Sequence, residues 1–129
     1  MRYRFAMCLL IVTIGGCASL FGTNKQKFSI FFQPYSVDLD QQARQTVDTA
    51  AAFAKDHPSQ PVELIGFAAP PDPGQDVAGL SAQRAEVVKQ ALVSIGVRPD
   101  RITVTANGIT DPENLPNLSV RRVDISVGP

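Results

Sequence analysis

The stretch Leu80–Val88 reads LSAQRAEVV and opens the clearest helical pattern in the chain. Apolar positions recur at steps of three and four residues, which is the spacing of one helix face. Gly96 follows where a left-handed glycine commonly ends a helix. The spacing therefore predicts a helix that begins at Asp76 or Ser81 and ends before Gly96. One member of this apolar stripe is charged: the stripe consists of Leu80, Arg84, Ala85, Val88, Leu92 and Ile95.

Upstream of this helix, the sequence predicts two strands separated by another helix. Lys27–Gln33 (KFSIFFQ) is rich in Phe and Ile and is followed by a proline, which indicates a buried strand. Asp38 is the expected N-cap of the next helix, which His57 and Pro58 should end. Val62–Ala68 (VELIGFA) is the second strand. The stripe of the intervening helix consists of Leu39, Ala43, Val47, Ala50 and Ala54.

Downstream, two alternating segments predict the third and fourth strands, Arg101–Ala106 (RITVTA) and Val120–Val127 (VRRVDISV). The resulting order is β-α-β-α-β-β. Two helical crossovers favour parallel pairing through right-handed units, and the closing strand should pair antiparallel. We therefore expect an α+β fold in two layers, a mixed sheet of four strands covered on one face by two helices.

The first sixteen residues have the plan of an export signal. Two arginines precede the ten-residue apolar run Phe5–Ile14, and Gly15 and Gly16 follow it. Ten residues at about 1.5 Å each cover only half of a ~30 Å hydrocarbon layer, so a spanning helix is not expected. Residues 1–16 are therefore interpreted as a signal peptide.

Ile14-Gly15-Gly16-Cys17 also resembles the bacterial lipobox. The resemblance implies cleavage before Cys17 and attachment of acyl chains, palmitate among them, to that cysteine. Cys8 would leave with the signal, so Cys17 is the only cysteine of the mature chain. Two or three acyl chains give a stable anchor, whereas one is marginal. Since no Asp follows Cys17, the resemblance further implies sorting to the inner leaflet of the outer membrane, with the domain facing the periplasm.

Residues 17–26 are expected to form a lipidated tether, and residues 27–129 a single domain. Two of the twelve basic residues, Arg2 and Arg4, precede Cys17, so the mature chain carries ten basic and twelve acidic residues, a net charge of −2. This balance speaks against nucleic acid as a partner. No nucleophilic triad, phosphate loop or metal-ligand spacing is present, so we expect neither an enzyme nor a cofactor or metal.

Leu80-Ser81-Ala82-Gln83-Arg84-Ala85 with Val87-Val88 resembles the L-S-x-x-R-A-x-x-V signature of OmpA-like C-terminal domains, the family of the peptidoglycan-associated lipoprotein. Arg121-Arg122-Val123-Asp124-Ile125 resembles the N-R-R-V-E-I segment that closes these domains. The resemblance covers residues 27–127. It implies non-covalent binding of peptidoglycan through the diaminopimelate residue of the stem peptide, with Arg84 as the cation that meets the ligand's carboxylate.

The chain departs from the family where the ligand's ammonium should bind. The family's G-H-T-D is Gly66-Phe67-Ala68-Ala69 here, so Ala69 replaces the acidic partner. Two family asparagines correspond to Val77 and Val120. Asp72 or Asp76 is a candidate substitute for the lost acid, although Asp72 lies between prolines. By strand parity, Arg121 points either to the helix-covered face and the site or to solvent at the strand end. The candidate ligand residues are therefore Arg84, Arg121 and Asp72.

Two functions remain open at this stage. The first is an outer-membrane lipoprotein whose domain binds peptidoglycan, weakened by loss of the acid. The alternative is a lipid-anchored protein-interaction subunit of a cell-envelope assembly that no longer binds peptidoglycan, with Phe67, Ala69 and Val77 making the pocket apolar for a protein partner.

Overall fold

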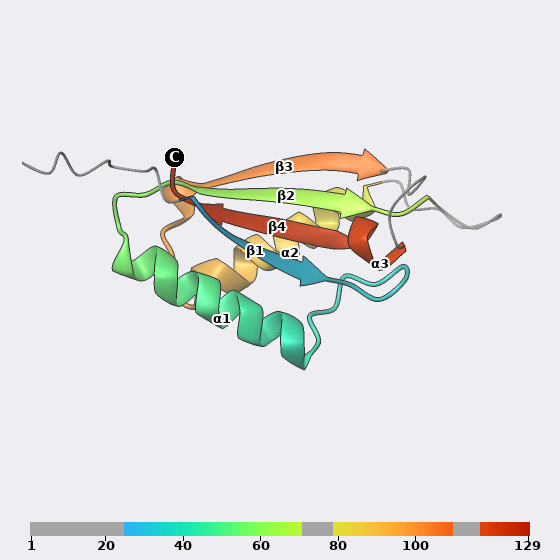
Figure 1. Ribbon diagram of the computed structural model, residues 1–129, viewed down its shortest axis with the longest axis horizontal. Coiled ribbons are helices and arrows are strands. Elements are labelled where there is room, and N and C mark those ends of the chain that lie inside the picture. Colours follow the sequence, from blue (N-terminus) through green and yellow to red (C-terminus); the bar gives the residue numbers. More distant parts are fainter. Residues whose placement is uncertain (1–24, 71–78, 110–116) are drawn as a thin grey trace, which may run out of the picture.

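The computed structural model describes residues 25–70, 79–109 and 117–129, and it contains four strands and two long helices (Figure 1). The expected signal peptide, Cys17 as the expected site of acylation, and Asp72 lie outside the described residues. The elements are β1 (Gln26–Phe31), α1 (Gln41–Asp56), β2 (Val62–Ala68), α2 (Leu80–Ser94), the 3-10 turn η1 (Pro99–Arg101), β3 (Ile102–Ile109), α3 (Asn117–Val120) and β4 (Arg122–Val127).

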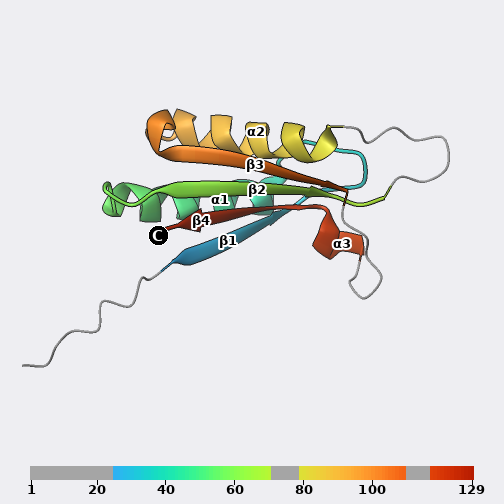
Figure 2. The ribbon, with the colours of Figure 1, turned by 90° about the horizontal axis from the view of Figure 1, so that it is seen from above.

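The strands form one mixed sheet in the order β1-β4-β2-β3 (Figure 2). β4 runs antiparallel to both of its neighbours, with Ile125 opposite Phe28 on one side and Leu64 on the other. β2 and β3 are parallel, as expected for strands joined by a helical crossover. The α+β class, the mixed four-stranded sheet and the antiparallel closing strand are therefore confirmed.

Alternation along the strands directs one face of the sheet toward α1 and α2. In β2, Val62, Leu64, Gly66 and Ala68 are buried, and the residues between them are partly exposed. The two predicted helical stripes fill the space above this face. The buried residues of α1 are Ala43, Val47, Ala50, Ala51 and Ala54, and those of α2 are Leu80, Ser81, Arg84, Ala85, Val88 and Leu92.

The start of α1 differs from the prediction. Asp38 was the expected N-cap, but Asp40 occupies that position, and its Oδ1 accepts a hydrogen bond of 2.7 Å from the Ala43 backbone N–H. The backbone N–H of Asp38 instead donates to Ser36 Oγ. Both aspartates precede the apolar periodicity by a few residues, and only the path of the loop decides which carboxylate reaches the helix. The end is as predicted, since His57 is the C-cap.

Other boundaries also shift by a few residues. α2 begins at Leu80, after Gly79 in the left-handed conformation, so Ser81 is its second residue, and Asp76 lies outside the described residues. Gly96 has φ of 107°, as its predicted role at the helix end requires. β1 ends at Phe31 and β3 extends to Ile109. The predicted fourth strand was too long at its start, because residues 117–120 form α3 and β4 begins at Arg122.

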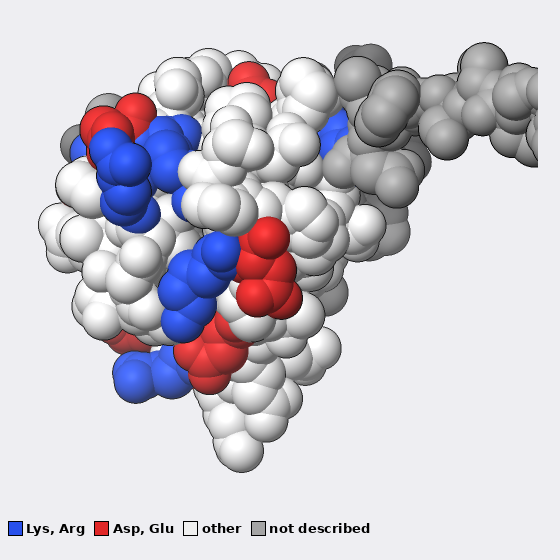
Figure 3. Space-filling model, turned by 90° about the vertical axis from the view of Figure 1, so that its left-hand side faces the viewer, with Lys and Arg blue, Asp and Glu red and all other residues white. Residues whose placement is uncertain are grey.

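The two ends of the domain differ in character. The carboxyl ends of β1, β2 and β3, the first turns of α1 and α2, and α3 all lie at one end, on the right of Figure 1. The opposite end carries Lys, Arg, Asp and Glu side chains of both signs, interspersed over the surface that Figure 3 shows. Neither sign forms an extended patch on that face. The candidate site residues belong to the first end.

Candidate functional site

Arg84 projects from the second turn of α2 into the interior, and its side chain is fully buried. Its guanidinium donates three hydrogen bonds to backbone carbonyls: Nε to Ser36 at 2.9 Å, Nη1 to Phe67 at 3.3 Å and Nη2 to Gln33 at 3.2 Å. The Phe32 ring lies beneath it, 5.1 Å from the guanidinium carbon. Arg84 thus joins α2 to the end of β2 and to the loop after β1.

Arg121 lies between α3 and β4 and is partly exposed. Its Nε donates to the carbonyl of Phe32 at 3.3 Å, and its own carbonyl accepts from the Phe32 N–H at 2.8 Å. Backbone and side chain therefore both bind Phe32, the residue whose ring lies under Arg84. Of the two predicted orientations, this is the one toward the Arg84 site.

The two guanidinium groups repel each other. Burial, and to a smaller extent the positive charge of Arg121, together lower the pKa of Arg84 to about 10. Neither arginine forms an ion pair with a carboxylate among the described residues. The N-terminus of α2, which no side chain caps in this part of the chain, adds partial positive charge at the same end. The arrangement attracts an anion.

The end of β2 packs tightly against the start of α2. A Cβ added to Gly66 would lie 2.1 Å from the carbonyl oxygen of Ser81 and 3.2 Å from the Cβ of Ala85, so only glycine fits there. Ser81 is buried, and its hydroxyl accepts a hydrogen bond of 3.1 Å from the Gly108 N–H of β3. The small residues of the signature therefore hold α2 close to the sheet and position Arg84.

The residues that differ from the family's signature differ in their contacts and burial. The carbonyl of Phe67, rather than its ring, contacts Arg84. Ala69 lies just beyond β2 and is partly exposed, and Val120 is fully buried at the end of α3. Asp72 and Val77 lie outside the described residues. The structure thus brings Arg84 and Arg121 together at the Phe32–Gln33 segment. The residue at the position of the family's acid is the partly exposed Ala69, which carries no charge.

A polar cluster on the uncovered face of the sheet was not foreseen from the sequence. Arg122 Nε contacts both carboxylate oxygens of Asp124 at 3.0 Å, and Ser29 Oγ donates to that carboxylate at 2.7 Å. The Arg122 guanidinium lies 4.3 Å from the centre of the Phe67 ring and also donates to the Ser119 carbonyl. The two-residue spacing of Arg122 and Asp124 was the available signal, because it places them on one strand face.

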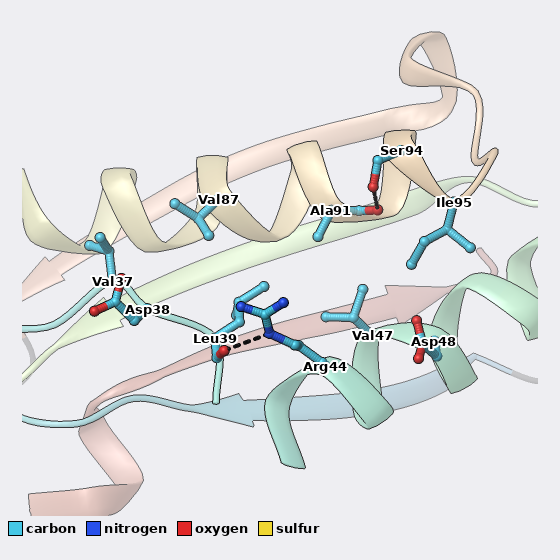
Figure 4. A pocket seen from close by; sticks show the side chains of 10 residues that line it. All are labelled: Val37, Asp38, Leu39, Arg44, Val47, Asp48, Val87, Ala91, Ser94 and Ile95. Atoms are coloured by element: carbon cyan, nitrogen blue, oxygen red, sulfur yellow. Dashed lines mark hydrogen bonds between the residues drawn. The ribbon is translucent and has the colours of Figure 1, made fainter. Parts of the chain in front are cut away.

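A cavity of about 480 Å³ lies between α1 and α2 (Figure 4). Val87 and Ala91 of α2, with Ile95 just after that helix, face Val47 of α1 across it (Figure 4). Arg44 crosses its opening and donates to the Leu39 carbonyl at 2.9 Å. This cavity is mainly apolar and is separate from the arginine pair.

The described residues contain neither a metal-ligand cluster nor a membrane-spanning helix. No group of three or more metal-ligating side chains occurs there. Within the same ranges, no helix has the length and apolar character needed to cross a membrane.

The fold agrees with comparisons to known proteins. The sequence model of the OmpA family matches residues 31–124, which is most of the chain, and the protein therefore belongs to the OmpA family. No curated protein sequence shows significant similarity to it.

Solved structures with the same fold come from several bacteria. The OmpA-like domain of FopA1 from Francisella tularensis superposes with a TM-score of 0.69 at 19% identity, covering 79% of this chain and 71% of that one. The peptidoglycan-associated lipoprotein from Burkholderia pseudomallei gives 0.66 at 23% identity, with 78% and 89% covered. The periplasmic domain of MotB from Helicobacter pylori gives 0.67 at 20% identity, with 81% and 76% covered.

Proposed function

We propose that this protein is an outer-membrane lipoprotein whose OmpA-like domain, residues 27–129, binds peptidoglycan non-covalently from the periplasmic side. The observation that carries the proposal is the pair formed by Arg84 and Arg121, two guanidinium groups without a carboxylate partner among the described residues. A buried or half-buried cation favours an external anion because binding offsets its lost hydration. The role is binding rather than catalysis.

The ligand group that suits this pair is the side-chain carboxylate of diaminopimelate in the stem peptide. Arg121 is the partly exposed member and is the one that meets the carboxylate. Arg84 lies behind it and fixes the Phe32–Gln33 segment to which Arg121 is bonded, so it is a positioning residue. The relative from Burkholderia pseudomallei, itself a peptidoglycan-associated lipoprotein, has the same fold and supports this assignment.

The membrane attachment belongs to the same proposal. Residues 1–16 are the signal, Cys17 is acylated after cleavage, and residues 17–26 tether the domain to the inner leaflet of the outer membrane. Incorporation of labelled palmitate in cells, followed by membrane fractionation, tests this step. A Cys17→Ser variant should lose both the label and the outer-membrane fraction, and a labelled Cys17→Ser protein would exclude Cys17 as the attachment site.

Sedimentation with purified sacculi tests the binding step. We expect the mature chain carrying Cys17→Ser to pellet with sacculi at low salt, and Arg121→Ala to remain in the supernatant. Arg98→Ala is the matched control, because Arg98 is a largely exposed arginine that precedes η1, beyond the C-terminal end of α2, and its ion pair among the described residues is with Asp100. Failure of the unmodified domain to pellet even at low salt would reject peptidoglycan binding.

One observation favours a second function. The guanidinium of Arg84 is fully buried and already bonded to three carbonyls, so it offers no accessible surface to a ligand. A domain in which this arginine is purely structural would serve as a lipid-anchored protein-interaction subunit of an envelope assembly. In-cell crosslinking separates the two functions: a specific protein partner without muropeptides supports the subunit, and muropeptides without a protein partner exclude it.

A further inference from the structure

The candidate site contains two positive charges and, in the described residues, no negative charge to accompany them. Described acids close in sequence to the two arginines or to the carbonyls that bind them are engaged elsewhere, and Glu86, two residues after Arg84, pairs with Lys89. Asp40 caps α1, Asp124 is bound by Arg122 and Ser29, and Asp38 lines the cavity between the helices. The two influences on the pKa of Arg84 are burial and Arg121, and both disfavour positive charge. A positively charged group of a ligand placed beside Arg84 and Arg121 would be repelled in the same way.

Diaminopimelate presents two charged groups on the carbon atom at the end of its side chain. The carboxylate suits the arginine pair, whereas an ammonium on the same carbon would be held close to two guanidinium groups and partly removed from water. Like charges placed together at an interface oppose binding, and a desolvated charge without a partner adds to the cost. The site therefore distinguishes ligands by the state of that nitrogen.

The nitrogen has two states in the cell wall. In an uncross-linked stem it is a free ammonium. In a stem that serves as the acceptor of a cross-link it is acylated by the neighbouring donor peptide and forms a neutral amide, and the adjacent carboxylate keeps its charge. The neutral amide can contact the partly exposed methyl group of Ala69, which lies two residues, or about 7 Å, along the chain from the carbonyl that binds Arg84.

From this asymmetry of charge we propose that the site selects cross-linked stem peptides, in which the diaminopimelate amine is acylated, over stems that carry the free amine. This inference rests on the proposed peptidoglycan function and names its substrate class. Ala69 is the residue that determines the specificity, because an acid at this position would supply the missing partner of an ammonium.

The test uses two ligands that differ by one charge. A disaccharide-tetrapeptide muropeptide has a single free amine, and acetylation of this amine converts it to a neutral amide without adding a second stem. Titration calorimetry with the mature chain carrying Cys17→Ser should give an affinity for the acetylated ligand at least about tenfold above that for the unmodified one. A third ligand, acetylated and with its diaminopimelate carboxylate amidated, should not bind.

The variant Ala69→Asp should reverse the order, so that the unmodified ligand binds more tightly than the acetylated one. Circular dichroism confirms that this variant, at a partly exposed position, keeps its fold. Equal or tighter binding of the unmodified ligand by the parent protein would overturn the proposed selectivity and leave peptidoglycan binding intact. Absence of binding by either ligand would overturn both the selectivity and the proposed function.

Discussion

The side chains of Arg84 and Arg121 donate to the carbonyls of adjacent residues, Gln33 and Phe32, at the point where β1 passes into the loop before α1. The two arginines come from elements that are far apart in the sequence, and their charges repel each other. The hydrogen bonds to Phe32 and Gln33 therefore hold two guanidinium groups close together although their positive charges repel each other. This relation leads to predictions about stability as well as binding.

Removal of Arg84 should destabilise the domain strongly. The Arg84→Ala variant removes three hydrogen bonds, those to the carbonyls of Gln33, Ser36 and Phe67, and opens a cavity above Phe32. We expect the free energy of unfolding, measured by urea denaturation, to fall by about 3 kcal/mol or more. Arg84→Lys should recover only part of this loss, because an ammonium lacks the planar fork of donors. A loss below about 1 kcal/mol would contradict the structural role of this side chain.

Removal of the charge on Arg121 should have the opposite effect on stability. The pKa of Arg84 in the folded protein, about 10, lies below its ordinary value, so the charged form opposes folding at all pH values below about 10. This penalty is relieved as the pH rises above about 10, because the folded protein then releases the proton while the unfolded chain still binds it.

Arg121→Gln keeps a polar group near the Phe32 carbonyl but removes the repulsion, which raises the pKa of Arg84. At neutral pH and low salt, the free energy of unfolding should increase by roughly 0.5–1 kcal/mol, while binding to sacculi is lost. Urea denaturation measures the first effect and sedimentation the second. A clear decrease in stability would show that the hydrogen bond of Arg121 outweighs its charge.

The close approach of α2 to β2 predicts that Gly66 tolerates no side chain. In Gly66→Ala the new Cβ would meet the backbone oxygen of Ser81 at 2.1 Å, so α2 must move away from the sheet. We expect a loss of about 2–3 kcal/mol in unfolding free energy. Gly108→Asn is the control, since a Cβ there meets nothing within 4 Å and asparagine tolerates its φ of 65°. Comparable losses for the two variants would contradict the packing argument.

The N-cap of α1 can be tested directly. Asp40→Ala removes the carboxylate that accepts from the Ala43 N–H and should lower the unfolding free energy by about 0.5–2 kcal/mol. Asp48→Ala changes an exposed aspartate in the middle of the same helix and should have little effect. Thermal denaturation of the two variants separates capping from a general effect of charge. Equal changes in melting temperature would rule out a specific cap.

The type and order of the elements could be read from the sequence because they follow from local periodicity. The apolar steps of three and four residues in α1 and α2, and the alternation in Val62–Ala68, reflect which side chains must leave water. Gly96 indicated a helix end because the chain leaves the helix there with a positive φ, which glycine adopts readily. The signature around Arg84 also identified the family correctly.

The tertiary structure alone decided how these elements meet. The insertion of β4 between β1 and β2 depends on contacts between residues distant in the sequence, and no local pattern specifies it. The choice of Asp40 over Asp38 as cap depends on the path of a loop. The hydrogen-bond acceptors of Arg84 are backbone carbonyls. Every residue has such a carbonyl, so the residue types in the sequence could not predict which ones bind Arg84. The sequence by itself thus determined that an arginine lies on an apolar helix face, and the fold determined that main-chain oxygens and a second arginine surround it.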